Sequence, residues 1–157
     1  MKGSGQKAIG DLIPDPENRR AHNDRNIGMI KDSIREVGLH RSIVIDEGDV
    51  IRAGNGVRKA ALEAGLTKLR IIDAEGDELI AVRRRNLTEE QKRALAIYDN
   101  RTGELSEWDF EQLAADKAAG LSLQPYWTAE EEAALFGTAK GDSSSAQRSS
   151  RCVSRLS

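Results

Sequence analysis

A turn bracketed by two glycines, Gly54-Asn55-Gly56, is the first stretch of the sequence that suggests chemistry. It follows a short strand-like stretch at 50–53 and precedes a segment, 57–64, whose apolar residues recur with the spacing of one helix face. This pattern predicts a strand, a tight turn and a helix. The first backbone N–H groups of a helix have no partner within it, and the helix dipole makes this end positive. The turn therefore predicts a site for an anion such as phosphate.

Two basic residues, Arg58 and Lys59, follow the turn. Positive charge is mildly unfavourable in the first turn of a helix, and a bound anion would relieve it. One interpretation is a phosphate cradle that these residues form with Gly54, Asn55 and Gly56. The other is an ordinary strand-to-helix turn with two solvated cations, because short glycine patterns are common.

A polar loop before the first predicted helix offers a second set of binding groups, namely Asn18, Arg19, Arg20 and His22. The loop follows two prolines and shows no periodicity, which predicts irregular backbone. Surface loops often carry binding residues. We interpret this one either as a binding loop or as a solvated connection.

Asp99 and Asn100 form a third candidate, near the end of a helix predicted to start at Thr88. The Asp99 carboxylate could hold Mg²⁺, and the Asn100 amide could bind a phosphate. Mg²⁺ that carries nucleotide phosphates usually takes one or two protein carboxylates, so one aspartate would suffice. The alternative is that both residues only cap the helix end.

The composition limits the classes of protein that fit. At 157 residues, with 38% hydrophobic and 32% charged residues, the chain suits one domain, or one domain with a tail. A net charge of -2 argues against a general nucleic-acid or membrane-surface binder, so a DNA contact would need a local patch. The single cysteine, Cys152, excludes a disulfide framework and a thiolate metal site. We see no signal peptide and no apolar run of about 20 residues, and expect a soluble cytoplasmic protein without a membrane partner.

Strand and helix patterns alternate along the chain. The predicted elements are an edge strand at 8–13, a helix from Asn23 or Asp24 to Gly38, strands at 42–46 and 50–53, a helix at 57–64, strands at 68–74 and 78–83, and helices at 88–101, 106–120 and 128–137. Capping boxes start two of the helices, Thr88 with Gln91 and Thr128 with Glu131. The run at 79–82 is typical of a buried strand.

These elements predict an N-terminal α/β core at 1–87, a helical extension at 88–137 and a serine-rich tail at 138–157. The low hydrophobicity of the tail predicts disorder. Four cations against Asp142 give the tail a charge of +3, so the rest of the chain carries -5, because the whole carries -2. The tail is either a solvated end or an arm that contacts DNA or a partner.

Several segments share an order and spacing that point to one family. They are Ile13-Pro14, the NxRxH pattern at 18–22, the SIxxxG pattern at 33–38, the AGxGxxxAA pattern at 53–61, and LAIYDNRTGELSEWD at 95–109. Together they resemble the N-terminal domain of ParB, of the ParB/sulfiredoxin superfamily, in the form found in phages and mobile elements and ahead of DNA-modification methyltransferases. The resemblance covers roughly residues 8–136.

The resemblance implies an α+β fold with a small mixed sheet, packed helices and a C-terminal helical extension. Partition ParB proteins bind CTP with Mg²⁺, which switches a DNA clamp. By resemblance, Arg19, Arg20 and the Gly54 turn would hold phosphates. Asp99 and Asn100 would stand where those proteins have a Glu-Asn pair near phosphate and metal.

The sequence departs at the turn from the family that it resembles. Partition proteins carry arginines directly after the glycine, whereas here Asn55, Gly56 and Val57 intervene before Arg58 and Lys59. The cysteine of sulfiredoxin and the histidine-arginine pair of the free-serine kinases are both absent from the turn. We therefore reject the sulfiredoxin activity, since Asn55 cannot act as the nucleophile. The acidic helices after residue 106 replace a DNA-reading helix-turn-helix and are interpreted as a packing cap.

Three hypotheses follow from the sequence. The first is a module that binds CTP or ATP with Mg²⁺ in DNA transactions, with weak nucleoside triphosphatase activity as one option. The second is a metal-dependent nuclease, for which Asp99 and Glu36 are the candidate ligands. The third is a non-catalytic domain that partners a DNA methyltransferase. The expected partners are a nucleotide, DNA bound directly or through another protein, and a second copy in a homodimer.

Overall fold

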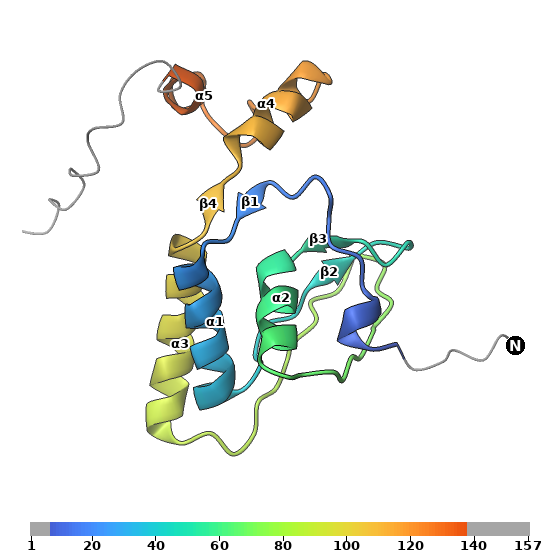
Figure 1. Cartoon of the computed structure of the whole chain (residues 1–157), viewed down its shortest axis with the longest axis vertical. Coiled ribbons are helices and arrows are strands. Elements are labelled where there is room, and N and C mark those ends of the chain that lie inside the picture. The colour runs from blue at the N-terminus through green and yellow to red at the C-terminus, as the bar shows by residue number, and fades with distance from the viewer. Residues whose placement is uncertain (1–6, 138–157) are drawn as a thin grey trace, which may run out of the picture. The chain divides into compact units, whose positions relative to one another are not determined.

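The computed structural model describes residues 7–137, which form a mixed α+β structure. Contacts divide the chain into two compact units, Met1–Leu113 and Ala114–Ser157, and each is described by itself. The described residues contain five α-helices and two small antiparallel sheets (Figure 1). The α+β class is therefore confirmed, while the domain boundary at 87/88 stays a prediction. The predicted disordered tail lies outside the described residues.

Helix α1, Asp24–Val37, is the centre of the first unit. Its N-cap is Asn23, whose side chain accepts a hydrogen bond from the Asn26 N–H, and it ends at Gly38, where φ is 76°. The predicted start at Asn23 or Asp24 and the predicted end at Gly38 are confirmed. The helix lies between α2, Asn55–Glu63, and α3, Glu89–Glu104 (Figure 1). The buried core consists of Ile9, Ile27, Ile30, Ile34, Ala60 and Ala61, and each isoleucine buried there stabilises the fold by about 1.5–3 kcal/mol.

A β-hairpin leads the chain into α2. Strands β2, Val44–Ile45, and β3, Ile51–Ala53, pair antiparallel, as predicted but over fewer residues. Asp46 fixes the turn between them, because its side chain accepts hydrogen bonds from the N–H groups of Gly48 and Val50 at 2.9 and 3.0 Å. Ile51 is fully buried and anchors the start of β3. The Gly54 turn is thereby held on the first unit's core.

The second sheet joins the polar loop to the residues after α3. Strands β1, Arg20–Ala21, and β4, Glu107–Trp108, pair antiparallel, with Arg20 opposite Trp108. The prediction that a helix begins at residue 106 was wrong, since α4 spans Phe110–Ala118. The local sequence predicted a helix at residues 106–109, but pairing with the distant 20–21 segment holds Glu107 and Trp108 in an extended conformation.

Three other predicted strands do not form. Residues 8–13 contain a short 3₁₀ helix, η1, Ile9–Asp11, between isolated bridges at Ala8 and Ile13. The segments 68–74 and 78–83 contain no strand, and Leu79, predicted to be buried, is 93% exposed. Their residues do favour the extended backbone of a strand. A strand also needs a neighbour that is hydrogen-bonded along its length, and among residues 7–137 these segments have only the isolated bridges Ala8–Lys68 and Ile13–Val50.

Both predicted capping boxes are confirmed. Thr88 and Gln91 start α3, and Thr128 and Glu131 start α5, Ala129–Gly137, in the second unit. Helix α3 continues to Glu104, slightly beyond the predicted end.

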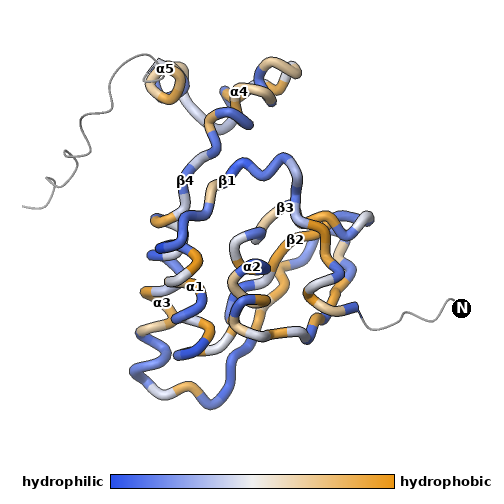
Figure 2. The backbone as a smooth tube through the Cα atoms, viewed as in Figure 1, coloured by the Kyte–Doolittle hydropathy of each residue, from blue (hydrophilic) through white to orange (hydrophobic). Residues whose placement is uncertain are grey.

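None of the helices within 7–137 has the length and apolar character needed to cross a membrane. Apolar and polar residues alternate over short distances along the backbone (Figure 2).

Candidate functional site

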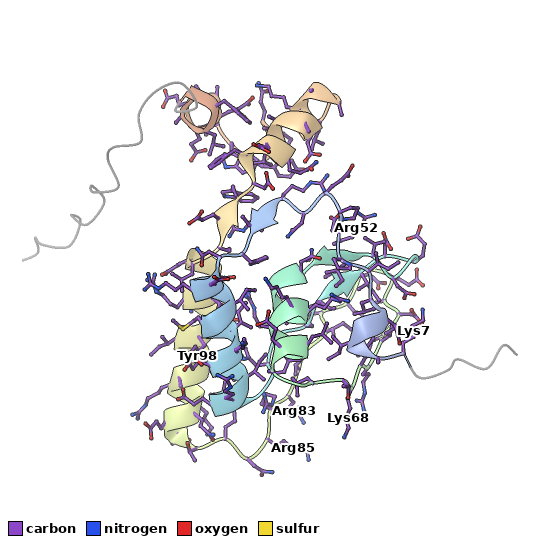
Figure 3. All side chains as sticks on the ribbon, viewed as in Figure 1. Lys7, Arg52, Lys68, Arg83, Arg85 and Tyr98 are labelled. Carbon is purple, nitrogen blue, oxygen red and sulfur yellow. The ribbon has the colours of Figure 1, made fainter. Side chains whose placement is uncertain are left out.

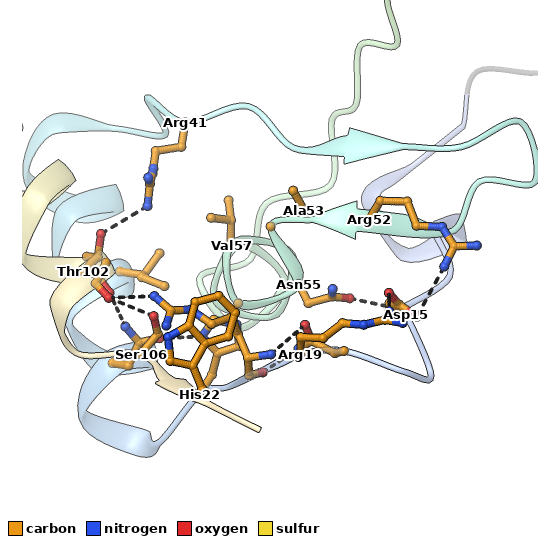
Figure 4. Close-up of a pocket in the computed structure, with 18 of the residues that line it drawn as sticks. Asp15, Arg19, His22, Arg41, Arg52, Ala53, Asn55, Val57, Thr102 and Ser106 are labelled. Atoms are coloured by element: carbon orange, nitrogen blue, oxygen red, sulfur yellow. Dashed lines mark hydrogen bonds and ion pairs between the residues drawn. The ribbon is translucent and has the colours of Figure 1, made fainter. Parts of the chain in front are cut away.

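A cavity of about 640 Å³ lies in the first unit. Four separate segments line it: the polar loop with the start of α1, residues 41–42, the junction of β3 with α2, and residues 102–108 (Figure 4). The β1–β4 pairing and the packing of α3 on α1 bring the last segment to the first. The cavity therefore exists only in the folded chain.

The predicted binding residues fall into two groups. The first group lines the cavity and consists of Asn18, Arg19, Arg20, His22, Gly54, Asn55 and Gly56. The second group does not line it and consists of Arg58, Lys59, Asp99 and Asn100. Arg58 donates to the carbonyl of Gly10 at 3.2 Å, and Asn100 donates to the Ala96 carbonyl of its own helix at 2.9 Å. The structure thus joins the polar loop to the glycine turn and leaves the basic pair after the turn outside.

The two glycines of the turn have different roles. Gly54 is the N-cap of α2 with φ 102°, and a Cβ there would overlap the side chain of Ile43. Gly56 has no room for a side chain either, because a Cβ at this position would lie 2.7 Å from the ring of His22. Gly54 is required by the backbone conformation and by Ile43. Gly56 allows His22 to lie against the start of α2.

His22 is held by a chain of hydrogen bonds to α3. Its Nδ1 lies 2.7 Å from Oδ1 of Asn26, and Nδ2 of Asn26 donates to the Thr102 carbonyl at 2.7 Å. An amide oxygen can only accept, so this network assigns the proton to Nδ1 of His22. In neutral His22 the other ring nitrogen, Nε2, is then a hydrogen-bond acceptor. Asn26, which is 1% exposed, was not predicted, although a polar residue on the buried face of α1 was a signal for it.

The lining of the cavity is strongly cationic. It contains four arginines, Arg19, Arg20, Arg41 and Arg52, and one acid, Asp15, which gives +3. The whole chain carries -2, so positive charge is concentrated at this place. The sequence pointed to Arg19 and Arg20, but not to Arg41 or Arg52, because no local pattern marks them.

Asp15 holds two of these arginines. It is 8% exposed, and its carboxylate oxygens lie 3.4 Å from Nη1 of Arg19 and 3.5 Å from Nη1 of Arg52. Its backbone N–H donates to Oδ1 of Asn55 at 3.0 Å. The Asn55 side chain therefore ties the turn to the loop, and the N–H groups at the start of α2 are the part of the turn suited to an anion.

Arg52 has a second acidic partner, Asp46. Its Nε donates to the Asp46 carboxylate at 2.8 Å. The pKa of Asp46 lies below its ordinary value, first because the Val50 N–H donates to it, and further because of Gly48 and Arg52. Asp46 is thus ionised at neutral pH and keeps Arg52 at the edge of the cavity.

Arg20 and Arg41 lie toward the other end. The Arg20 guanidinium lies 4.4 Å from the ring centroid of Trp108, and its Nη2 donates to the Gly103 carbonyl at 3.4 Å. Nε of Arg41 lies 3.0 Å from the carboxylate of Asp99, and Nη1 lies 3.5 Å from Oγ1 of Thr102. A cation stacked on an aromatic ring keeps its planar donors in place while its edge remains available to an anion.

These residues do not fit a Mg²⁺ ion held by the protein. Asp15, the only carboxylate in the lining, is paired with arginines, and Asp99 is paired with Arg41. Among residues 7–137, no three or more His, Cys, Asp or Glu side chains come together as metal ligands. Arginines and helix N–H groups are donors, and they suit an anion.

The comparisons with known proteins give no match. No protein-family model, no curated protein and no solved structure matches this chain. The site is therefore interpreted from its own residues.

Proposed function

We propose that this chain is a ParB-like module that binds a nucleoside triphosphate, CTP or ATP, and serves as an accessory unit in DNA transactions of a phage or mobile element, in partition or DNA modification. The observation that carries the proposal is the cationic cavity in which the 18–22 loop and the Gly54 turn meet. These are two of the segments on which the resemblance to ParB rests.

The size and chemistry of the cavity support a nucleotide. Pockets for small ligands commonly measure about 300–1,000 Å³, and this one measures about 640 Å³. The N-terminus of α2 and four arginines offer donors for phosphate oxygens. Trp108 adds an aromatic face beside Arg20.

Mg²⁺ enters this proposal as an ion carried by the triphosphate. Bound in that way, it would neutralise part of the phosphate charge. The protein supplies the arginines, and its carboxylates remain in their ion pairs with Arg19, Arg52 and Arg41. The arginine-rich lining supports binding more directly than turnover.

A thermal-shift panel tests the proposal. CTP, ATP, GTP and UTP, each with Mg²⁺, are added at saturating concentration, and at least one is expected to raise the Tm. Arg20→Ala and Gly54→Val should remove this rise, whereas Arg93→Ala should retain it, because Arg93 is exposed on α3 and does not line the cavity. Gly54→Val also strains the backbone, so Arg20→Ala decides the outcome, with circular dichroism to confirm its fold. The absence of any shift with all four nucleotides would refute nucleotide binding.

The two alternatives have less support from the site. A metal-dependent nuclease requires carboxylates that converge on one point, and the described residues offer no such group. A non-catalytic domain that partners a DNA methyltransferase would bind that enzyme with the same affinity whether nucleotide is present or not. A pull-down with and without CTP separates it from the first proposal.

A further inference from the structure

The segment between α2 and α3 exposes a run of large apolar side chains. Every residue from 70 to 83 is exposed. The large apolar residues among them are Ile71, Ile72, Leu79, Ile80 and Val82, with exposed fractions between 41% and 93%. Large apolar side chains that are exposed together in one short segment point to an interaction site.

The backbone of this segment is also without partners. Among residues 7–137, no backbone–backbone hydrogen bond reaches residues 69–87. The residues are nonetheless rich in types that favour strands, and the chain bends at Gly76, where φ is 89°. An unpaired, β-prone segment is a template for pairing with another strand.

The charges of the second half of the segment, 77–85, indicate which strand fits. Asp77 and Glu78 begin it, and three arginines, Arg83, Arg84 and Arg85, end it. Arg83 and Arg85 are exposed (Figure 3), while Arg84 donates to the Leu39 carbonyl. A nucleic acid would require one sign of charge along the segment. Opposite signs at the two ends instead favour an antiparallel copy of the same segment.

A twofold axis through Ala81 makes this complementarity specific. In such an antiparallel pair, Asp77 lies opposite Arg85 of the second copy, and Glu78 lies opposite Arg84. Ile80 lies opposite Val82 next to the axis, and Leu79 lies opposite Arg83 on the other face of the pair. Opposite charges and apolar residues that face each other across strands stabilise a sheet, and an isologous interface uses each pair twice.

We propose that residues 77–85 form an intermolecular antiparallel strand pair with the same residues of a second copy, which makes the protein a homodimer. The pairing gives partners to the N–H and C=O groups on the edge of the strand that faces the second copy, and it brings Ile80 and Val82 into contact across the two strands. It lies on a segment that contributes nothing to the lining of the cavity, and it does not depend on nucleotide binding.

Sedimentation velocity over a range of concentrations, with the full chain, tests the proposal by charge exchange. Asp77→Arg and Arg85→Asp should each raise the dimer dissociation constant by about tenfold, because the axis repeats each like-charge contact. The double variant Asp77→Arg/Arg85→Asp should restore the dimer. Ile80→Asp should give a monomer. Asp73→Arg is the matched control, since residue 73 is exposed but lies outside 77–85, and it should dimerise like the wild type.

Each other outcome overturns the proposal. A wild-type monomer at every concentration would show that the segment does not pair with a second copy. A dimer unchanged by Ile80→Asp would place the interface elsewhere. A dimer that both single exchanges weaken and the double exchange does not restore would rule out the register about Ala81. Unchanged circular dichroism of the variants confirms that these changes act on association and not on folding.

Discussion

Nε of Arg41 lies 3.0 Å from the carboxylate of Asp99, and Arg41 lines the cavity whereas Asp99 does not. Nε2 of His40 lies 3.8 Å from the same carboxylate oxygen. Asp99, whose side chain is 48% exposed, thus acts as the ion-pair partner of Arg41. The sequence had suggested a metal ligand at this position.

The first prediction concerns this pair. Asp99→Asn should change the affinity for a nucleoside triphosphate by the same factor in Mg²⁺ as in EDTA, because the carboxylate acts on Arg41. Arg41→Ala should weaken binding by about tenfold, the effect of losing one charge-assisted hydrogen bond. Isothermal titration calorimetry measures both. If Asp99→Asn weakened binding in Mg²⁺ alone, Asp99 would be a metal ligand after all.

The second prediction separates steric overlap from backbone strain at glycine. Gly54 and Gly65 both have positive φ, 102° and 80°, but a Cβ meets Ile43 at the first and nothing within 4 Å at the second. Gly65→Ala should lower the free energy of unfolding by about 1 kcal/mol. Gly54→Ala should cost about 1–3 kcal/mol more, because the core must move. Urea unfolding gives both values, and equal costs would show that Ile43 adapts freely.

The third prediction is a loss of stability in alkali. Tyr98 donates a hydrogen bond to Glu36 at 2.6 Å, and this bond, with burial and the charge of Glu36, raises the pKa of Tyr98 from 10 to about 12. Between these values the unfolded chain loses the proton and the folded chain keeps it, so stability falls as pH rises from 10 to 12. Tyr98→Phe should be less stable than the wild type below pH 10. The difference between the two proteins should shrink by pH 12.

Denaturant unfolding at several pH values follows this difference. Tyr126→Phe is the control, because Tyr126 is 66% exposed and lies in the second unit. A constant difference between Tyr98→Phe and the wild type from pH 8 to pH 12 would contradict the assignment.

The fourth prediction uses the Arg20–Trp108 contact as a reporter of binding. The chain has two tryptophans, Trp108 and Trp127. A phosphate bound by Arg20 should change the environment of the ring 4.4 Å away. The fluorescence of Trp127→Phe, which retains Trp108, should therefore change on addition of nucleotide, and that of Trp108→Phe should not. A change that persists in Trp108→Phe would locate the ligand elsewhere.

Local signals in the sequence predicted the helices well. The N-cap Asn23 and the capping box of Thr88 and Gln91 lie where expected. Each cap is a contact between residues two to four positions apart, so its energy is decided by neighbours in the chain. The strands predicted at 68–74 and 78–83 were wrong for the opposite reason. A strand is stabilised by residues that can come from anywhere in the chain.

The candidate site shows the same division. The residue types of the 18–22 loop and of the Gly54 turn were enough to identify both as candidates for an anion site, and the structure brings both to one cavity. The folded chain was needed to show that Arg41, Arg52 and Trp108 also line this cavity and that Asp15 pairs with arginines. It also shows that Arg58 and Lys59 lie outside the cavity. Which charges meet depends on helix packing and on the β1–β4 pairing, and these follow from burial of side chains far apart in the chain, which no local pattern records.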